Sequence, residues 1–133
     1  MQEISVIKQV GDTGKRTISS LNIPGIDPET GLLYFDNDIE LYMVILYSYV
    51  KNTPAVIDRI RIVNQGSLND YAICVHTLKS SSRSIGANGV ADMAERLEVL
   101  AKEGNLAMVM ALNGGFIADV EDLLGGLSVW IEG

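Results

Sequence analysis

The sequence predicts an all-α protein, an antiparallel four-helix bundle with a short additional helix at its N-terminal end. Of the 133 residues, 47% are hydrophobic but only 6% are aromatic, a bias that suits helix packing better than a sheet sandwich. Apolar residues recur at three- and four-residue spacing in segments that are separated by turns of only a few residues. Because such short connections make neighbouring helices antiparallel, and because this length suits one core, we expect a single bundle domain.

The first 26 residues differ from the rest of the chain because they show no sustained hydrophobic period. They also contain four residues that interrupt helices: Gly11, Gly14, Pro24 and Gly25. We therefore expect residues 1–26 to form an arm or linker, and residues 27–133 to form the helical bundle domain.

The bundle is expected to begin with a short helix followed by a longer one. Asp27-Pro28 places a capping side chain before a proline at the first helical position and predicts a helix that ends near Phe35. The next predicted helix, over residues 39–50, has one apolar face and additional apolar residues on its other sides. We expect part of this surplus to be exposed and to dock a partner protein. The candidates for this docking surface are Leu41, Val44, Ile45 and Tyr49.

Four further helix starts can be placed from capping residues, at Thr53, Ser67, Asn88 and Asn105. Thr53-Pro54 repeats the cap-then-proline pattern and predicts a separate helix, which Gly66 closes. Two later helices begin at Asn88 and Asn105. Between them and Gly66 lies a helix over residues 67–85, whose inward stripe is predicted to be Tyr71, Cys74, Val75, Leu78, Ser82 and Ile85.

Charge and composition exclude several classes of function. The net charge of -7 argues against general affinity for nucleic acid and favours a protein partner. One cysteine, Cys74, and one histidine cannot form an internal disulfide or a Cys/His zinc site. The longest apolar stretch, within residues 41–50, is much shorter than the roughly 20 residues that span a membrane, and the N-terminus lacks a secretory signal. These features predict a cytoplasmic, monomeric domain.

His76 is the only histidine, so any histidine-based acid, base or nucleophile must be this residue. At about 100° per residue, it points away from the centre of the inward stripe, and we expect it to be at least partly exposed. Lys79, Ser80 and Arg83 follow on the same face, where a phosphoryl group on the imidazole would find partners. Periodicity alone favours a simpler interpretation, since a lone helical histidine beside Lys and Arg usually belongs to a solvated face.

The residues around His76 favour a functional role. The segment His76–Ala87, HTLKSSSRSIGA, resembles the H-x-L-K-G/S-S/A-x-x-x-G-A segment around the phosphorylated histidine of histidine-containing phosphotransfer (HPt) domains. Stretches within residues 23–42 resemble the start of such domains, and residues 94–98 resemble the helix after the histidine helix. The resemblance covers roughly residues 23–124, and the domain is expected to be of the type found at the C-terminal end of hybrid sensor kinases.

The resemblance implies a phosphorelay carrier. His76 would accept a phosphoryl group on Nε2 from the aspartyl phosphate of one receiver domain and pass it to another receiver aspartate. Lys79 is expected to contact the phosphoryl group, with Arg83 and Ser80 as further contacts. Many HPt domains have glycine at the position of Ser80, and this departure is expected to alter partner choice or phosphohistidine lifetime. The receiver would supply Mg²⁺, so the chain needs no cofactor or metal of its own and has no kinase or hydrolase activity.

The expected partners are receiver domains and a hybrid histidine kinase, and two other functions compete with the carrier. One is a non-phosphorylated helical docking module in which His76 is unused. The other is a serine-histidine hydrolase, which needs an oxyanion hole and a buried acid that orients His76, and the sequence near His76 supplies neither. Residues 11–17 have the wrong spacing for a phosphate-binding loop, and residues 36–47 lack the glycine and final glutamate of a calcium loop.

Overall fold

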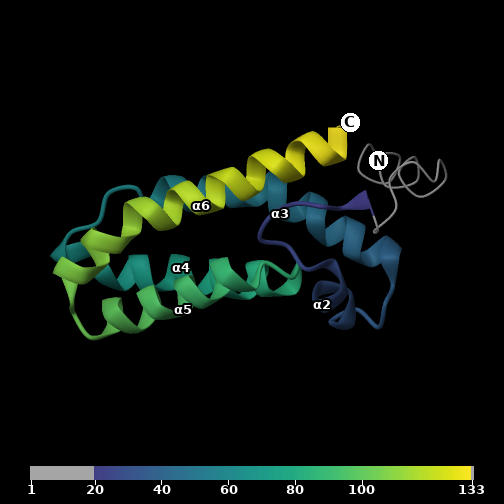
Figure 1. Cartoon of the computed structure of the whole chain (residues 1–133). Coiled ribbons are helices and arrows are strands. Elements are labelled where there is room, and N and C mark those ends of the chain that lie inside the picture. The colour runs from purple at the N-terminus through teal and green to yellow at the C-terminus, as the bar shows by residue number, and fades with distance from the viewer. Residues whose placement is uncertain (1–19, 133) are drawn as a thin grey trace.

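Figure 1 shows the computed structural model of the chain, which describes residues 20–132. Within these residues the secondary structure is entirely helical, which confirms the predicted all-α bundle with a short N-terminal helix. The elements are α2 (Pro28–Leu33), α3 (Ile39–Ile60), the 3-10 turn η2 (Gln65–Ser67), α4 (Leu68–Ser84), α5 (Asn88–Lys102) and α6 (Leu106–Glu132).

The four long helices are antiparallel to their neighbours in the chain. Three residues, 85–87, connect α4 to α5, and residues 103–105 connect α5 to α6. In Figure 1, α4 and α5 lie side by side, α6 lies along α3, and α2 lies at the end of the bundle where α3 begins. None of the helices in the described part of the chain is long and apolar enough to cross a membrane.

The predicted break at Thr53-Pro54 is wrong, because α3 continues through Pro54 to Ile60. Thr53 is buried and does not act as an N-cap. Apart from Met43, the buried residues of α3 keep three- and four-residue spacing across the proline: Tyr42, Leu46, Tyr49, Thr53, Ile57 and Ile60. Packing of this continuous stripe outweighs the backbone hydrogen bond that proline cannot make.

Close backbone contact joins α2 to the end of α4. Gly86 has a positive φ of 84°, and its carbonyl accepts a hydrogen bond of 2.9 Å from the Asp27 N–H. Asp27 in turn caps α2, as predicted, because its carboxylate accepts from the N–H and the hydroxyl of Thr30. The Tyr42 hydroxyl donates to the Ile85 carbonyl at 2.7 Å, so α3 is tied to the same junction.

Part of the segment expected to be an arm packs against the bundle. Leu21 is buried, and the Trp130 indole N–H donates to the Ser20 hydroxyl at 3.2 Å. A β-carbon at Gly126 would lie 3.1 Å from Cγ2 of Ile23, so this segment contacts α6 closely. Residues 1–19 lie outside the described residues, and the division of the chain at residue 26 stays a prediction.

Candidate functional site

His76 lies on the outer side of α4, as its position on the helix predicts. Its side chain is 56% exposed, whereas Val75 and Leu78 beside it are fully buried. The inward stripe predicted for this helix is confirmed, because all six of its members are buried: Tyr71, Cys74, Val75, Leu78, Ser82 and Ile85. Burial of these neighbours fixes the helix, so the imidazole has a defined position at the surface.

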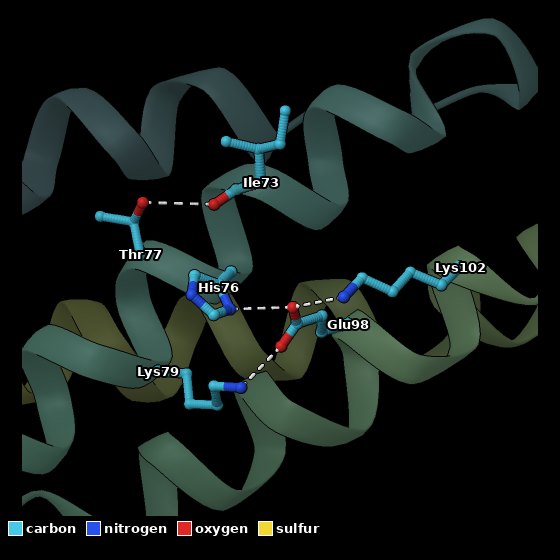
Figure 2. Close-up of polar contacts among 6 residues, drawn as sticks. All are labelled: Ile73, His76, Thr77, Lys79, Glu98 and Lys102. Carbon is cyan, nitrogen blue, oxygen red and sulfur yellow. Dashed lines mark hydrogen bonds and ion pairs between the residues drawn. The ribbon is translucent and has the colours of Figure 1, made fainter.

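The imidazole is held by a carboxylate from the neighbouring helix (Figure 2). Nδ1 of His76 lies 2.9 Å from Oε2 of Glu98 on α5. Glu98 also accepts hydrogen bonds from Nζ of Lys79, at 2.8 Å, and from Nζ of Lys102, at 3.0 Å. The side chain of Glu98 is only 7% exposed, although three charged or polar side chains meet on it. The site is therefore a four-residue cluster of α4 and α5, which we call the Glu98 cluster.

Glu98 is ionised in this cluster. Burial raises the pKa of its carboxyl, but the hydrogen bonds from Lys79, Lys102 and His76 lower it more, to about 2. An ionised carboxylate only accepts hydrogen bonds, so we assign the proton in the contact with His76 to Nδ1. In this tautomer Nε2 carries the free lone pair, and Figure 2 shows the second ring nitrogen on the side away from Glu98.

Glu98 corrects one expectation from the sequence, namely that no buried acid orients His76. The acid lies 22 positions later in the chain and reaches the ring only because α5 packs along α4. Glu98 is also the one side chain within residues 20–132 that hydrogen-bonds this imidazole. A serine hydroxyl bonded to the ring, which a serine-histidine hydrolase requires, is thus not found among the described residues.

The three residues predicted to contact the phosphoryl group, Lys79, Arg83 and Ser80, have different surroundings in the structure. Lys79 lies beside His76 because both bind Glu98. Arg83 instead donates to Asp92 of α5 at 3.1 Å, and Ser80 is exposed on α4. Their roles as contacts stay predictions. Lys102, which the sequence reasoning missed, brings a second ammonium group to the cluster.

A metal site was not predicted. In the part of the chain that the structure describes, no three His, Cys, Asp or Glu side chains are grouped in a way that could hold a metal ion. Two of the four Glu98 cluster residues, Lys79 and Lys102, carry ammonium groups, which suits an anionic ligand such as a phosphoryl group.

The predicted docking surface on α3 is exposed only in part. Leu41 and Val44 are each 42% exposed and Ile45 is half-buried. Tyr49 is buried, and its hydroxyl shares a hydrogen bond of 2.9 Å with the Ser82 hydroxyl, so the exposed candidates are Leu41, Val44 and, in part, Ile45. Ile45 lines a groove between α3 and α4 together with Thr77, the residue after His76. Leu41 lies one helical turn before Ile45 and extends this apolar edge.

The family of the chain follows from a comparison with known protein families. Residues 44–129, about two thirds of the chain, match the family model of the Hpt domain. No curated protein and no solved structure matches significantly. The matched range contains His76 and the other three residues of the Glu98 cluster, together with most of α3 and α6 and all of α4 and α5. The chain therefore belongs to the Hpt domain family of phosphotransfer carriers in two-component signalling.

Proposed function

We propose that His76 accepts a phosphoryl group from the aspartyl phosphate of a receiver domain and passes it to the aspartate of another. One observation carries this proposal: an exposed imidazole whose Nδ1 is held by a buried, ionised carboxylate. Because Nδ1 is occupied, the free lone pair lies on Nε2. That nitrogen is the only ring atom that can act as the nucleophile without breaking the contact with Glu98.

The acceptor step needs little from the carrier beyond position and charge. The Nε2 lone pair attacks phosphorus, and the bond from phosphorus to the aspartyl oxygen breaks, with its electron pair left on the receiver carboxylate. The phosphoryl group brings about two negative charges to the surface of α4. Lys79 and Lys102 are within the same cluster and supply positive charge there. Phosphoryl transfer depends mainly on positioning and charge stabilisation. The receiver would supply the Mg²⁺ that its own acidic site needs.

The proposal is tested by incubating the chain with a receiver that carries labelled aspartyl phosphate in the presence of Mg²⁺. We expect the chain to gain label that is labile in acid and stable in alkali, as expected for phosphohistidine. Label that is stable in acid, or no label with any receiver that such relays use, would contradict the assignment.

Loss of the Lys79 ammonium should slow this step. In Lys79→Ala we expect labelling to be slower by about 10- to 100-fold, equal to about 1.4 to 2.7 kcal/mol of barrier, because Lys79 is 23% exposed beside the ring and stabilises the transferring charge. Labelling reactions quenched at a series of times give the rate, and circular dichroism checks that helix content is unchanged. Arg59→Ala removes an exposed cation near the end of α3 and serves as the control. Equal rates in both variants would assign Lys79 to the solvated surface.

Receiver binding is expected to use the apolar edge at Leu41. Leu41→Glu should weaken binding by about tenfold, or about 1.4 kcal/mol, because transient signalling contacts are small and tolerate little polar intrusion. Titration calorimetry with a receiver measures the affinity. Ile62→Glu is the matched control, since Ile62 is 83% exposed but lies between α3 and η2. If Ile62→Glu weakens binding as much as Leu41→Glu does, the docking surface has been misplaced.

A further inference from the structure

Phosphorylation of Nε2 would change the charge of the imidazole that Glu98 holds. The ring that attacks phosphorus must have a free lone pair on Nε2, and the tautomer assigned above places its one proton on Nδ1, which lies 2.9 Å from Oε2 of Glu98. After transfer the ring carries both this proton and the Nε2–phosphorus bond, and it is formally a cation. A carboxylate that already accepts from Nδ1 is then the counter-ion of that cation.

We propose that Glu98 is a positioning residue for the onward step, in which it keeps the proton on Nδ1 of the phosphorylated ring and thereby makes His76 a ready phosphoryl donor. This inference rests on the proposed function, since it concerns phosphorylated His76. Glu98 then has two roles. Before transfer it selects the tautomer of His76, and after transfer it controls how readily the phosphoryl group leaves.

The chemistry of the onward step explains why this proton matters. The receiver aspartate oxygen attacks phosphorus, the Nε2–phosphorus bond breaks, and its electron pair returns to Nε2. If Nδ1 still holds its proton, the departing group is neutral imidazole. If that proton has been lost, the departing group is an imidazolate anion, which is a much poorer leaving group. Protons and electrons balance in both cases, but transfer is fast only when the departing group is neutral imidazole.

The surroundings of Glu98 suit it for holding this proton. Its side chain is 7% exposed, so little water competes for its oxygens, and Lys79 and Lys102 keep it ionised. Two other acids that line the cleft beside His76 are more exposed, and one of them, Asp92, is bound to Arg83. The charged groups lining the clefts on either side of the ring are Lys79 of α4 and Asp92, Glu95, Arg96, Glu98 and Lys102 of α5. Among them only Glu98 touches Nδ1.

Glu98→Gln separates the charge of this side chain from its shape. The Gln carbonyl can still accept from Nδ1–H, so the tautomer that the acceptor step needs is retained. The neutral amide cannot stabilise a cationic ring, and it can rotate to donate to an Nδ1 that has lost its proton. Once His76 is phosphorylated, Glu98→Gln should therefore lose the phosphoryl group more slowly in alkali than the unchanged chain does.

The experiment uses phosphoramidate, a small phosphoryl donor, to load His76 without a partner domain. After removal of the donor, ³¹P NMR follows the loss of phosphohistidine from about pH 5 to about pH 9, and transfer to an added receiver is followed over the same range. Near pH 8.5 we expect Glu98→Gln to lose its phosphoryl group about tenfold more slowly than the unchanged chain, with the two rates converging near pH 5. Glu95→Gln, the same chemical change at an exposed position of the same cleft, should match the unchanged chain.

Several outcomes would overturn this inference. Identical pH profiles for the unchanged chain and Glu98→Gln would do so. If Glu98→Gln loses the phosphoryl group more slowly by the same factor at every pH, the inference also fails. Such a result would show that Lys79 and Lys102, which no longer pair with a carboxylate, retain the phosphoryl group, and that the ring proton does not control its loss. A measurement on the unchanged chain is independent of any variant: ¹⁵N NMR of phosphorylated His76 near pH 8.5 should show a protonated Nδ1, and an unprotonated Nδ1 contradicts the proposal. If His76 cannot be loaded at all, the proposed function fails instead.

Discussion

His76→Gln is expected to abolish phosphoryl acceptance while the bundle remains folded. The side chain is 56% exposed, and its hydrogen bond to Glu98 can be replaced by the amide of glutamine, so the free energy of unfolding should change by less than about 1 kcal/mol. The amide nitrogen has no available lone pair for attack on phosphorus. Labelling with a phosphorylated receiver should therefore fall to background, and thermal unfolding followed by circular dichroism checks the fold.

The same variant separates transfer from docking. If the chain is a carrier, His76→Gln should still bind a receiver, because the apolar edge that includes Leu41 is unchanged. Label that remains on His76→Gln would place the acceptor elsewhere and contradict the assignment. A receiver that is regulated equally well by His76→Gln and by the unchanged chain would instead support the alternative, a docking module that needs no phosphorylation.

Gly86→Ala is expected to destabilise the fold by more than about 3 kcal/mol. Two independent costs combine at this position. Gly86 has φ of 84°, which disfavours any side chain, and a β-carbon would lie 1.9 Å from the carbonyl oxygen of Asp27. To admit it, the segment before α2 must move away from α4 and lose the hydrogen bond between Asp27 and Gly86. Urea unfolding measures the change in the free energy of unfolding.

Gly114→Ala provides the matched control for this substitution. Gly114 lies inside α6, and a β-carbon there would meet no atom within 4 Å. Because alanine favours helix over glycine, this variant should be more stable by up to about 1 kcal/mol. A Gly86→Ala protein as stable as the unchanged chain would show that the junction of α2 and α4 is not as tightly packed as described.

The helices with one clearly apolar and one clearly polar face were predictable from the sequence. Burial of the α4 stripe and exposure of His76 follow from three- and four-residue spacing alone. The break predicted at Thr53-Pro54 failed because a local proline signal was given more weight than an apolar stripe that continues across it. Gly114-Gly115 similarly weakens a helical assignment, yet α6 continues through it because Val109, Phe116 and Val120 pack in the core.

The Glu98 cluster was less predictable, because it depends on packing between two helices. Glu98 and Lys102 are four residues apart and form an ion pair along one side of α5, but this spacing carries no information about α4. The contact between Glu98 and His76 depends on how α5 is aligned along α4, and a single sequence does not specify this alignment. Which of the four docking candidates is buried depends on packing in the same way, since the Tyr49 hydroxyl forms a buried hydrogen bond with Ser82 of α4.

The central claim is that the chain both accepts and delivers a phosphoryl group through His76. It is tested most directly with two receivers of different size, one carrying labelled aspartyl phosphate and the other unlabelled, mixed with Mg²⁺ and a trace of the chain. We predict that label appears on the second receiver when the unchanged chain is present, and does not appear with His76→Gln or without the chain. Label that reaches the second receiver equally fast in all three mixtures, or that accumulates on the chain and never leaves it, would contradict the account.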